Sequence, residues 1–186
     1  IPLVLVCMLL RPANSARVDW INLTGAETAP NIAEITVFDD RVEVALEVYV
    51  GDLETFSALV PDDWLKDQAT ERPPLAERLR QFSENGLRFV TDSGKKLQAA
   101  LRLVEPRLRK DRFSPFAGMI NPYTRQPIPG PPEDKRVLYA ELVYPFAKKP
   151  KTLTIVPPLE GGMSKVPIGF MTYHKEVPLV DFRYLS

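Results

Sequence analysis

The strongest constraint on the fold is a ten-residue segment of strict alternation, residues 41–50, which reads RVEVALEVYV. Every second side chain is aliphatic, and Arg, Glu, Ala and Tyr stand between them. A period of two predicts a strand with one buried face and one face in water. Residues 31–38, NIAEITVF, also alternate, and Asp39-Asp40 separates the two runs. We therefore predict a β-hairpin here, with Glu43 and Glu47 on its solvated face.

Further strands are predicted along the rest of the chain. Asp92-Ser93-Gly94 predicts a turn that joins two of them into a second hairpin, and Pro178 predicts an edge strand or a bulge. Seven or eight short strands separated by turn signals predict a mainly β domain, specifically an antiparallel β-sandwich of the Ig-like or Greek-key type. The additional strands are expected at residues 87–91, 95–104, 135–144, 151–156, 168–174 and 177–184.

A short two-helix insertion is predicted between the two hairpins. Asp52 is placed to cap the first helix, which Pro61 ends. Pro73-Pro74 opens the second helix, and Gly86 follows Asn85 as a natural stop. The apolar positions expected to face the core are Leu53, Phe56 and Leu59 in the first helix, and Leu75, Leu79 and Phe82 in the second.

The first residues have the pattern of an export signal. Residues 1–10, IPLVLVCMLL, are apolar but too few to span a bilayer, and small residues follow them. This predicts an N-terminally truncated signal peptide over residues 1–16, cleaved after Ser15 or Ala16. A buried N-terminal strand is the alternative. Residues 17–186 are then a single domain, which we expect to continue beyond residue 186 and to lie in the periplasm or on the extracytoplasmic face of the membrane.

Charge and residue usage exclude several classes of function. The 24 basic and 24 acidic residues balance, which argues against nucleic-acid binding. His174 is the one histidine, and Cys7, the one cysteine, lies inside the predicted signal, so no cofactor or transition-metal site is expected. Asp39-Asp40 and Asp62-Asp63 lack the spacing of a calcium loop and are interpreted as exposed acidic turns. Without a G-x-S-x-G elbow, the chain is expected not to be an enzyme.

A loop of about 22 residues, 113–134, contains six prolines. Loops this long are usually functional or disordered, and the first half of this one is too apolar for a solvated linker. Either it folds back onto the core, or it is a docking surface for a partner; we predict the second. The predicted docking residues are Phe113, Phe116, Met119, Ile120 and Tyr123.

A basic run precedes this loop, with Arg107, Arg109, Lys110 and Arg112. Acidic lipid headgroups or an acidic partner are conceivable ligands for such a run. We interpret it as a solvated edge strand.

The C-terminal half resembles a known group of domains. The stretches VLYAELVYPF at 137–146, KTLTIVPP at 151–158 and IGFMTYH at 168–174, followed by a final strand, are similar to extracytoplasmic β-domains of bacterial HupE/UreJ-type membrane proteins. The resemblance is one of strand order over residues 17–186. Those families are associated with nickel uptake, but their histidine-rich intramembrane motif is absent from this sequence, so nickel transport is not carried over.

Three functions follow as alternatives. The first is a non-catalytic extracytoplasmic interaction or assembly domain of a larger, membrane-anchored bacterial protein. Its partner is then the membrane domain of the same protein, or another membrane or periplasmic protein. The second is a carbohydrate-type ligand-binding sandwich that uses Trp20 or Trp64 on a concave surface. The third is a carboxylate-based hydrolase, which requires two acids across a cleft.

Overall fold

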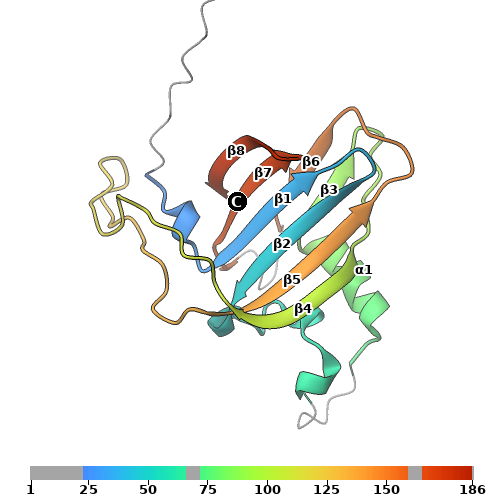
Figure 1. Ribbon diagram of the computed structural model, residues 1–186, viewed down its shortest axis with the longest axis horizontal. Helices are drawn as coiled ribbons and strands as arrows, with labels where there is room; N and C mark the ends of the chain where they lie inside the picture. The colour runs from blue at the N-terminus through green and yellow to red at the C-terminus, as the bar shows by residue number, and fades with distance from the viewer. Residues whose placement is uncertain (1–22, 66–71, 159–164, 186) are drawn as a thin grey trace, which may run out of the picture.

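The computed structural model describes residues 23–65, 72–158 and 165–185, and these residues form a mainly β domain (Figure 1). Its largest element is a six-stranded mixed sheet with the strand order β4-β5-β2-β1-β7-β8. The sheet contains β1 (Asn31–Val37), β2 (Arg41–Tyr49), β4 (Ala100–Leu108), β5 (Arg136–Pro145), β7 (Ile168–His174) and β8 (Val177–Tyr184). A separate two-stranded sheet pairs β3 (Arg88–Thr91) with β6 (Leu153–Val156), and α1 spans Leu75–Asn85.

The predicted first hairpin is confirmed. β1 and β2 are antiparallel, with Ile35 opposite Val44, and Val44 in turn lies opposite Leu142 of β5. These three side chains are at most 1% exposed, so the alternating aliphatic residues all face one side of the sheet. Burial of this row stabilises the sheet through the hydrophobic effect.

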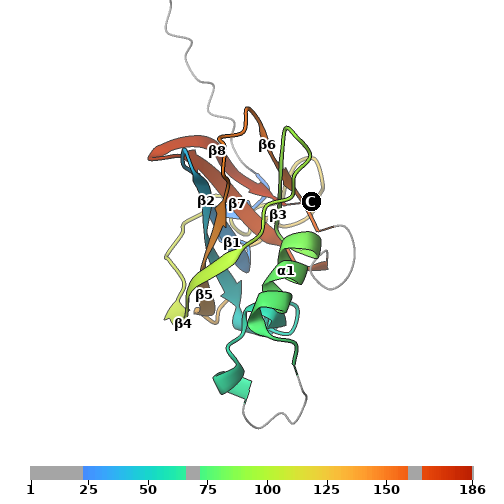
Figure 2. The same ribbon diagram turned by 90° about the vertical axis from the view of Figure 1, so that its right-hand side faces the viewer.

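The second layer covers only that apolar side. Figure 2 shows α1 and the β3–β6 pair on one face of the six-stranded sheet, while the other face has no second layer. Phe82 of α1 and Phe89 of β3 pack into the same core cluster as Tyr144 of β5. Tyr144 is fully buried, meets the Phe89 ring edge-on at 4.6 Å, and donates a hydrogen bond to the Leu87 carbonyl. Sheet and second layer therefore share one core.

The structure does not confirm an Ig-like or Greek-key sandwich. The second layer consists of two strands and a helix rather than a comparable sheet, and β1 and β7 run parallel. A parallel pair needs a long crossover connection, and here the chain between β1 and β7 contains the whole second layer.

The predicted second hairpin between residues 87–91 and 95–104 is confirmed only around its turn, where the Thr91 carbonyl accepts from the Gly94 N–H and the Thr91 N–H donates to the Lys95 carbonyl; the second strand does not run on to residue 104. β3 pairs with β6, and its link to the following segment is an isolated bridge between Val90 and Lys96. Leu97 is buried and donates its backbone N–H to the Phe89 carbonyl, whereas β4 begins only at Ala100 in the main sheet. The chain changes layers between these points, so it cannot continue as one strand.

Of the two predicted helices, the second is confirmed. α1 starts directly after Pro73-Pro74 and ends at Asn85, before Gly86. The first predicted helix is absent from this part of the chain, which instead forms short 3₁₀ helices. Asp52 does not cap a helix, because its carboxylate accepts a 2.7 Å hydrogen bond from the Asn31 side chain. The 3₁₀ helices are η1 (Ala26–Thr28), η2 (Val50–Asp52), η3 (Ser57–Leu59) and η4 (Asp62–Leu65).

The predictions for the two ends have different outcomes. Pro178 lies in β8, the edge strand, beside a shift in register against β7, as predicted. The predicted signal peptide, with Cys7 and the cleavage site, lies outside the described residues. Within the described residues, no helix has the length and apolar character needed to cross a membrane.

Candidate functional site

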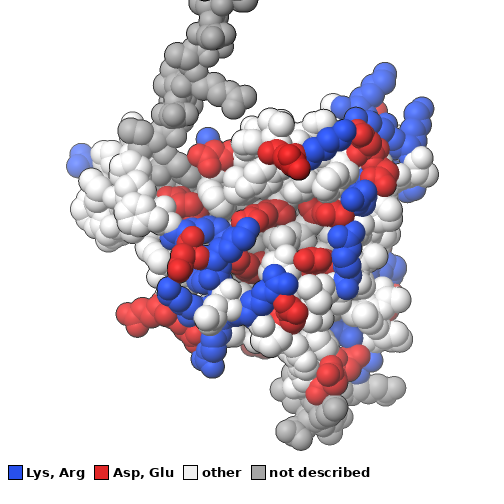
Figure 3. Space-filling model, viewed as in Figure 1, with Lys and Arg blue, Asp and Glu red and all other residues white. Residues whose placement is uncertain are grey.

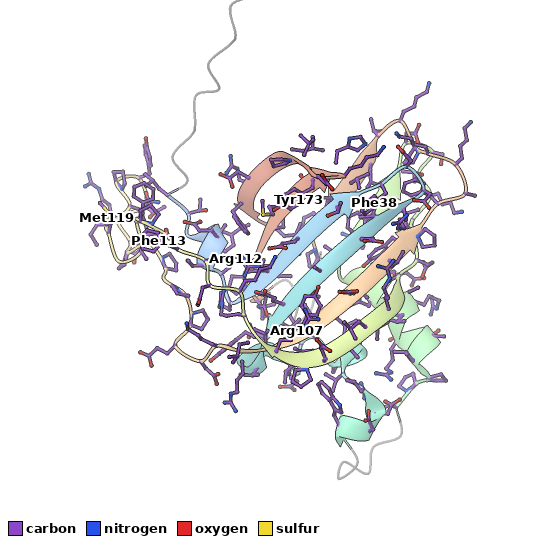
Figure 4. All side chains as sticks on the ribbon, viewed as in Figure 1. Phe38, Arg107, Arg112, Phe113, Met119 and Tyr173 are labelled. Atoms are coloured by element: carbon purple, nitrogen blue, oxygen red, sulfur yellow. The ribbon has the colours of Figure 1, made fainter. Side chains whose placement is uncertain are left out.

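The β4–β5 loop (residues 109–135) projects from the sheet and carries the predicted docking residues (Figure 1). Exposed fractions are 85% for Phe113, 54% for Met119, 59% for Ile120 and 86% for Tyr123. We call these four residues the apolar patch; Figure 4 labels two of them, and in Figure 3 the projecting tip of the loop shows almost no charged side chains. Phe116 is half-buried, so it belongs partly to the loop's own packing.

The tip of the loop is held in a defined shape by its own hydrogen bonds. The backbone N–H of Gly118 donates to the Ile128 carbonyl at 2.9 Å, and the Ile128 N–H donates back to Met119 at 2.8 Å. The Asn121 carboxamide oxygen accepts from the backbone N–H of Tyr123 at 2.9 Å, as in an Asx-turn. Ile128 is buried, whereas the patch residues point outward. The loop therefore does not depend on burial of the patch for its conformation.

The middle and second half of the loop are hydrogen-bonded to the segment before β1. The Asn121 side-chain N–H donates to the Leu23 carbonyl at 3.0 Å, and the Thr28 hydroxyl donates to the Pro129 carbonyl at 3.0 Å. Gly25 adopts a φ of 74°, and a Cβ there would lie 2.9 Å from the Pro129 carbonyl oxygen. Only glycine permits this close approach without strain.

The start of the loop is held in place by the side chains of the basic run. Arg109 is buried and donates to the Ala29 carbonyl at 2.8 Å. Arg112, labelled in Figure 4, donates to Glu47 at 2.6 Å and to Glu34 at 2.9 Å. Lys110 completes the cluster with a 2.7 Å ion pair to Glu34. We call Glu34, Glu47, Lys110 and Arg112 the root cluster.

The root cluster shifts the ionisation of its members. Burial alone would raise the pKa of Glu34, but hydrogen bonds from Lys110 and Arg112 hold that pKa below its ordinary value. Burial alone would lower the pKa of Arg112, but hydrogen bonds to Glu47 and Glu34 raise it. Glu34 and Arg112 therefore stay charged at neutral pH, and each member of the cluster lies against a group of opposite sign.

Two interpretations from the sequence are corrected here. Glu47 was expected on a solvated face, but it is 6% exposed and is covered by Arg112. The basic run was expected to be a solvated edge strand, yet Arg109 is buried and Arg112 is paired internally. Arg107 fits the expectation better: it lies over the Tyr139 ring, 3.7 Å from its centroid, and pairs with Glu105. The basic run therefore attaches the loop to the sheet. The sequence does not show this role, because it depends on the fold that places Glu34 of β1 and Glu47 of β2 next to the run.

The face of the sheet that has no second layer contains a shallow hollow of about 200 Å³. Its acids are engaged: burial alone would raise the pKa of Glu43, but hydrogen bonds from Arg41 and Arg102 hold it below its ordinary value. Glu141 accepts a hydrogen bond from the Tyr139 hydroxyl. Figure 3 shows positive and negative side chains interleaved over this face. An ionised, salt-bridged Glu43 does not suit a general acid, which needs a raised pKa.

The other candidate residues do not assemble into a site. Asp39 pairs with Lys149 and Lys175, whose hydrogen bonds lower the Asp39 pKa to about 2, and Asp62 pairs with Arg78. In the described part of the chain, no group of three or more His, Cys, Asp or Glu side chains is arranged to hold a metal ion. Trp64 is exposed on η4 and lines none of the hollows described here, and Trp20 lies outside the described residues.

Comparisons of the chain with protein-family models, with curated proteins and with solved structures found no match.

Proposed function

We propose that this chain is a non-catalytic, extracytoplasmic interaction domain that docks a membrane-associated protein partner through the β4–β5 loop. The observation that carries the proposal is a loop fixed at both sides whose apolar patch is exposed. Soluble monomers rarely expose large apolar patches unless they serve an interaction.

The shape of the loop favours binding over a role in stability. A surface that is ordered before binding loses less conformational entropy when its partner arrives. Tyr123 and Phe113 are the natural anchors, because aromatic side chains contribute large contact areas and are enriched among residues that dominate binding energy. Met119 and Ile120 extend the same surface with flexible and aliphatic contact area.

Export and membrane association support the choice of partner. The apolar segment at residues 1–10 supports export, and the strand order resembles that of HupE/UreJ-type extracytoplasmic domains. The second layer above the main sheet gives the domain a sandwich-like core, and such scaffolds commonly present binding loops. The carbohydrate-binding and hydrolase alternatives have less support, because Trp64 lines no hollow described above and Glu43 is held ionised.

A site-specific crosslink tests the docking proposal. A photoreactive residue is placed at position 123 of the full-length protein in its native envelope, and a matched one at Lys96, an exposed position in the second layer. We expect a discrete crosslinked protein from position 123 only, and its loss in Ile120→Ser. Crosslinks to lipid alone, or a protein crosslink unchanged in Ile120→Ser, would refute the proposal.

Stability measurements complete the test. Phe113→Ser and Tyr123→Ser are expected to change the free energy of unfolding by no more than about 0.5 kcal/mol, as for exposed positions. Val177→Ser, which removes an equally apolar exposed side chain from β8, is the control that leaves the crosslink intact.

N-terminal sequencing of the exported protein tests cleavage after Ser15 or Ala16, and retention of Cys7 contradicts it.

A further inference from the structure

An open apolar groove of about 620 Å³ lies beside the β1–β2 turn. Figure 1 shows this turn at the end of the sheet opposite the β4–β5 loop. It is bounded by the β1–β2 turn, the loop between β5 and β6, and the inner face of β7 and β8. The groove exists because the second layer is narrower than the sheet: β6 is its last strand, and β7 and β8 extend past it. Its apolar lining includes Phe38, Phe146, Leu153, Ile155, Phe170 and Val180.

The size and lining suit a small molecule with a long apolar part. Binding pockets for such ligands have volumes of roughly 300–1,000 Å³ and combine apolar walls with a few polar groups that fix orientation. In this groove the polar groups are few, and Thr154, Thr172 and His174 are among them. The walls come from both layers of the domain, so an alkyl chain in the groove contacts Ile155 on one side and Phe170 on the other.

The charges at the groove have one sign. Lys149 and Lys151 line it, and none of the described residues that line it is an acid. An adjoining hollow of about 280 Å³ shares both lysines and adds Lys95 and Lys148, against the single carboxylate of Asp92.

Only part of this positive charge is neutralised. Lys149 forms a 2.5 Å ion pair with Asp39, which also binds Lys175. Lys148 and Lys151 have no ion pair with any residue that the structure describes. Among the described residues, the positive charge of Lys151 at the groove therefore has no acidic partner.

From this combination we infer that the groove binds a long-chain fatty acid. The alkyl chain lies among the apolar side chains of β6, β7 and β8, and the carboxylate lies at the mouth, nearest to Lys151. The positive charge of the lysines favours a ligand with an anionic head group. The volume of the groove is that of a single small-molecule pocket, so it fits one alkyl chain. The site is separate from the apolar patch and does not depend on the proposed docking function.

Titration with palmitate tests this inference, with hexadecanol as the uncharged ligand of equal chain length. We expect saturable palmitate binding that weakens by more than about tenfold in Lys151→Glu, because losing one charge-assisted contact accounts for about tenfold and the new carboxylate adds repulsion. Lys135→Glu changes an exposed lysine just before β5, at the end of the strand opposite the groove residue Phe146; it is the matched control and is expected to bind like wild type. Hexadecanol is expected to bind at least about tenfold more weakly than palmitate, for the same reason.

A second variant blocks the groove itself. Leu179 lines the groove yet is largely exposed, so Leu179→Glu places a carboxylate at the alkyl site with little effect on folding. We expect palmitate binding to be lost in this variant while its circular dichroism and melting temperature stay at wild-type values. If Lys151→Glu is misfolded, Lys151→Ala replaces it, with a smaller expected loss. No saturable binding, equal affinity for hexadecanol, or wild-type affinity in Leu179→Glu would overturn the inference.

Discussion

Arg112 donates a 2.6 Å hydrogen bond to Glu47, a residue 65 positions earlier in the chain, and both side chains are about nine-tenths buried. The pair joins the start of the β4–β5 loop to the C-terminal part of β2. Because Glu34 of β1 shares the same guanidinium, one side chain holds two strands and the loop together.

Arg112→Ala is expected to lower the free energy of unfolding by about 3 kcal/mol, because Glu47 is left buried without its partner. Chemical denaturation of both proteins measures the difference. Lys135→Ala is the control: its ion pair with Asp111 is exposed, so the expected change is no more than about 0.5 kcal/mol. A loss below about 1 kcal/mol in Arg112→Ala would show that the pair contributes little.

The root cluster also predicts a dependence of stability on pH. The pKa of Glu34 is lower in the folded protein than its ordinary value of 4.5. The folded state therefore gains stability above about pH 4.5, and this stability is lost as the pH falls toward the lowered folded value. We expect unfolding free energies measured between pH 7 and pH 3 to fall less steeply in Glu34→Gln than in wild type. Equal slopes in the two proteins contradict this account.

Gly169 is predicted to tolerate no side chain. A Cβ at this position in β7 would lie 1.9 Å from the Ala26 carbonyl oxygen, so η1 or the β1–β7 pair must shift. Gly169→Ala is expected to cost about 1–3 kcal/mol, as for overpacked sites, and thermal denaturation measures it. Gly130→Ala, whose nearest neighbour would be 3.7 Å away, serves as the control and is expected to unfold like wild type.

Tyr144→Phe removes the buried hydroxyl that donates to the Leu87 carbonyl at 3.1 Å. The ring keeps its edge-on contact with Phe89, so the change isolates the hydrogen bond. We expect a loss of about 1–2 kcal/mol, because a buried carbonyl loses its partner. Tyr139→Phe, at the partly exposed hydroxyl bonded to Glu141, is expected to lose less. If the two variants have the same stability, the Leu87 contact does not contribute as proposed.

Local pattern was sufficient for part of the fold. The alternation at residues 41–50 predicted β2 and its buried face, and Pro73-Pro74 with Gly86 predicted the limits of α1. These signals are local, because a strand period and a helix stop depend on neighbouring residues. The pairing of β3 with β6 and the parallel β1–β7 pair join segments far apart in the chain, and local patterns do not specify such partners.

For the candidate site too, the sequence predicted one part and missed another. Its apolar composition identified the loop, and four of its five predicted residues are exposed. The fastening by Glu34 and Glu47 was missed: Glu47 was assigned to a solvated surface by alternation alone, and Glu34 was given no role. Alternation places a side chain on one face of a sheet, but it does not show whether another segment, here residues 109–112, covers that face.

The fixed attachment of the β4–β5 loop has a mechanical consequence. Hydrogen bonds tie one side of the loop to β1 and β2 and the other side to Leu23 and Thr28. Under the proposed docking function, a partner bound at the tip would be held at a set angle to the sheet, and tension on the tip would pass directly into the two central strands. The orientation of the domain relative to that partner would then be set when the chain folds.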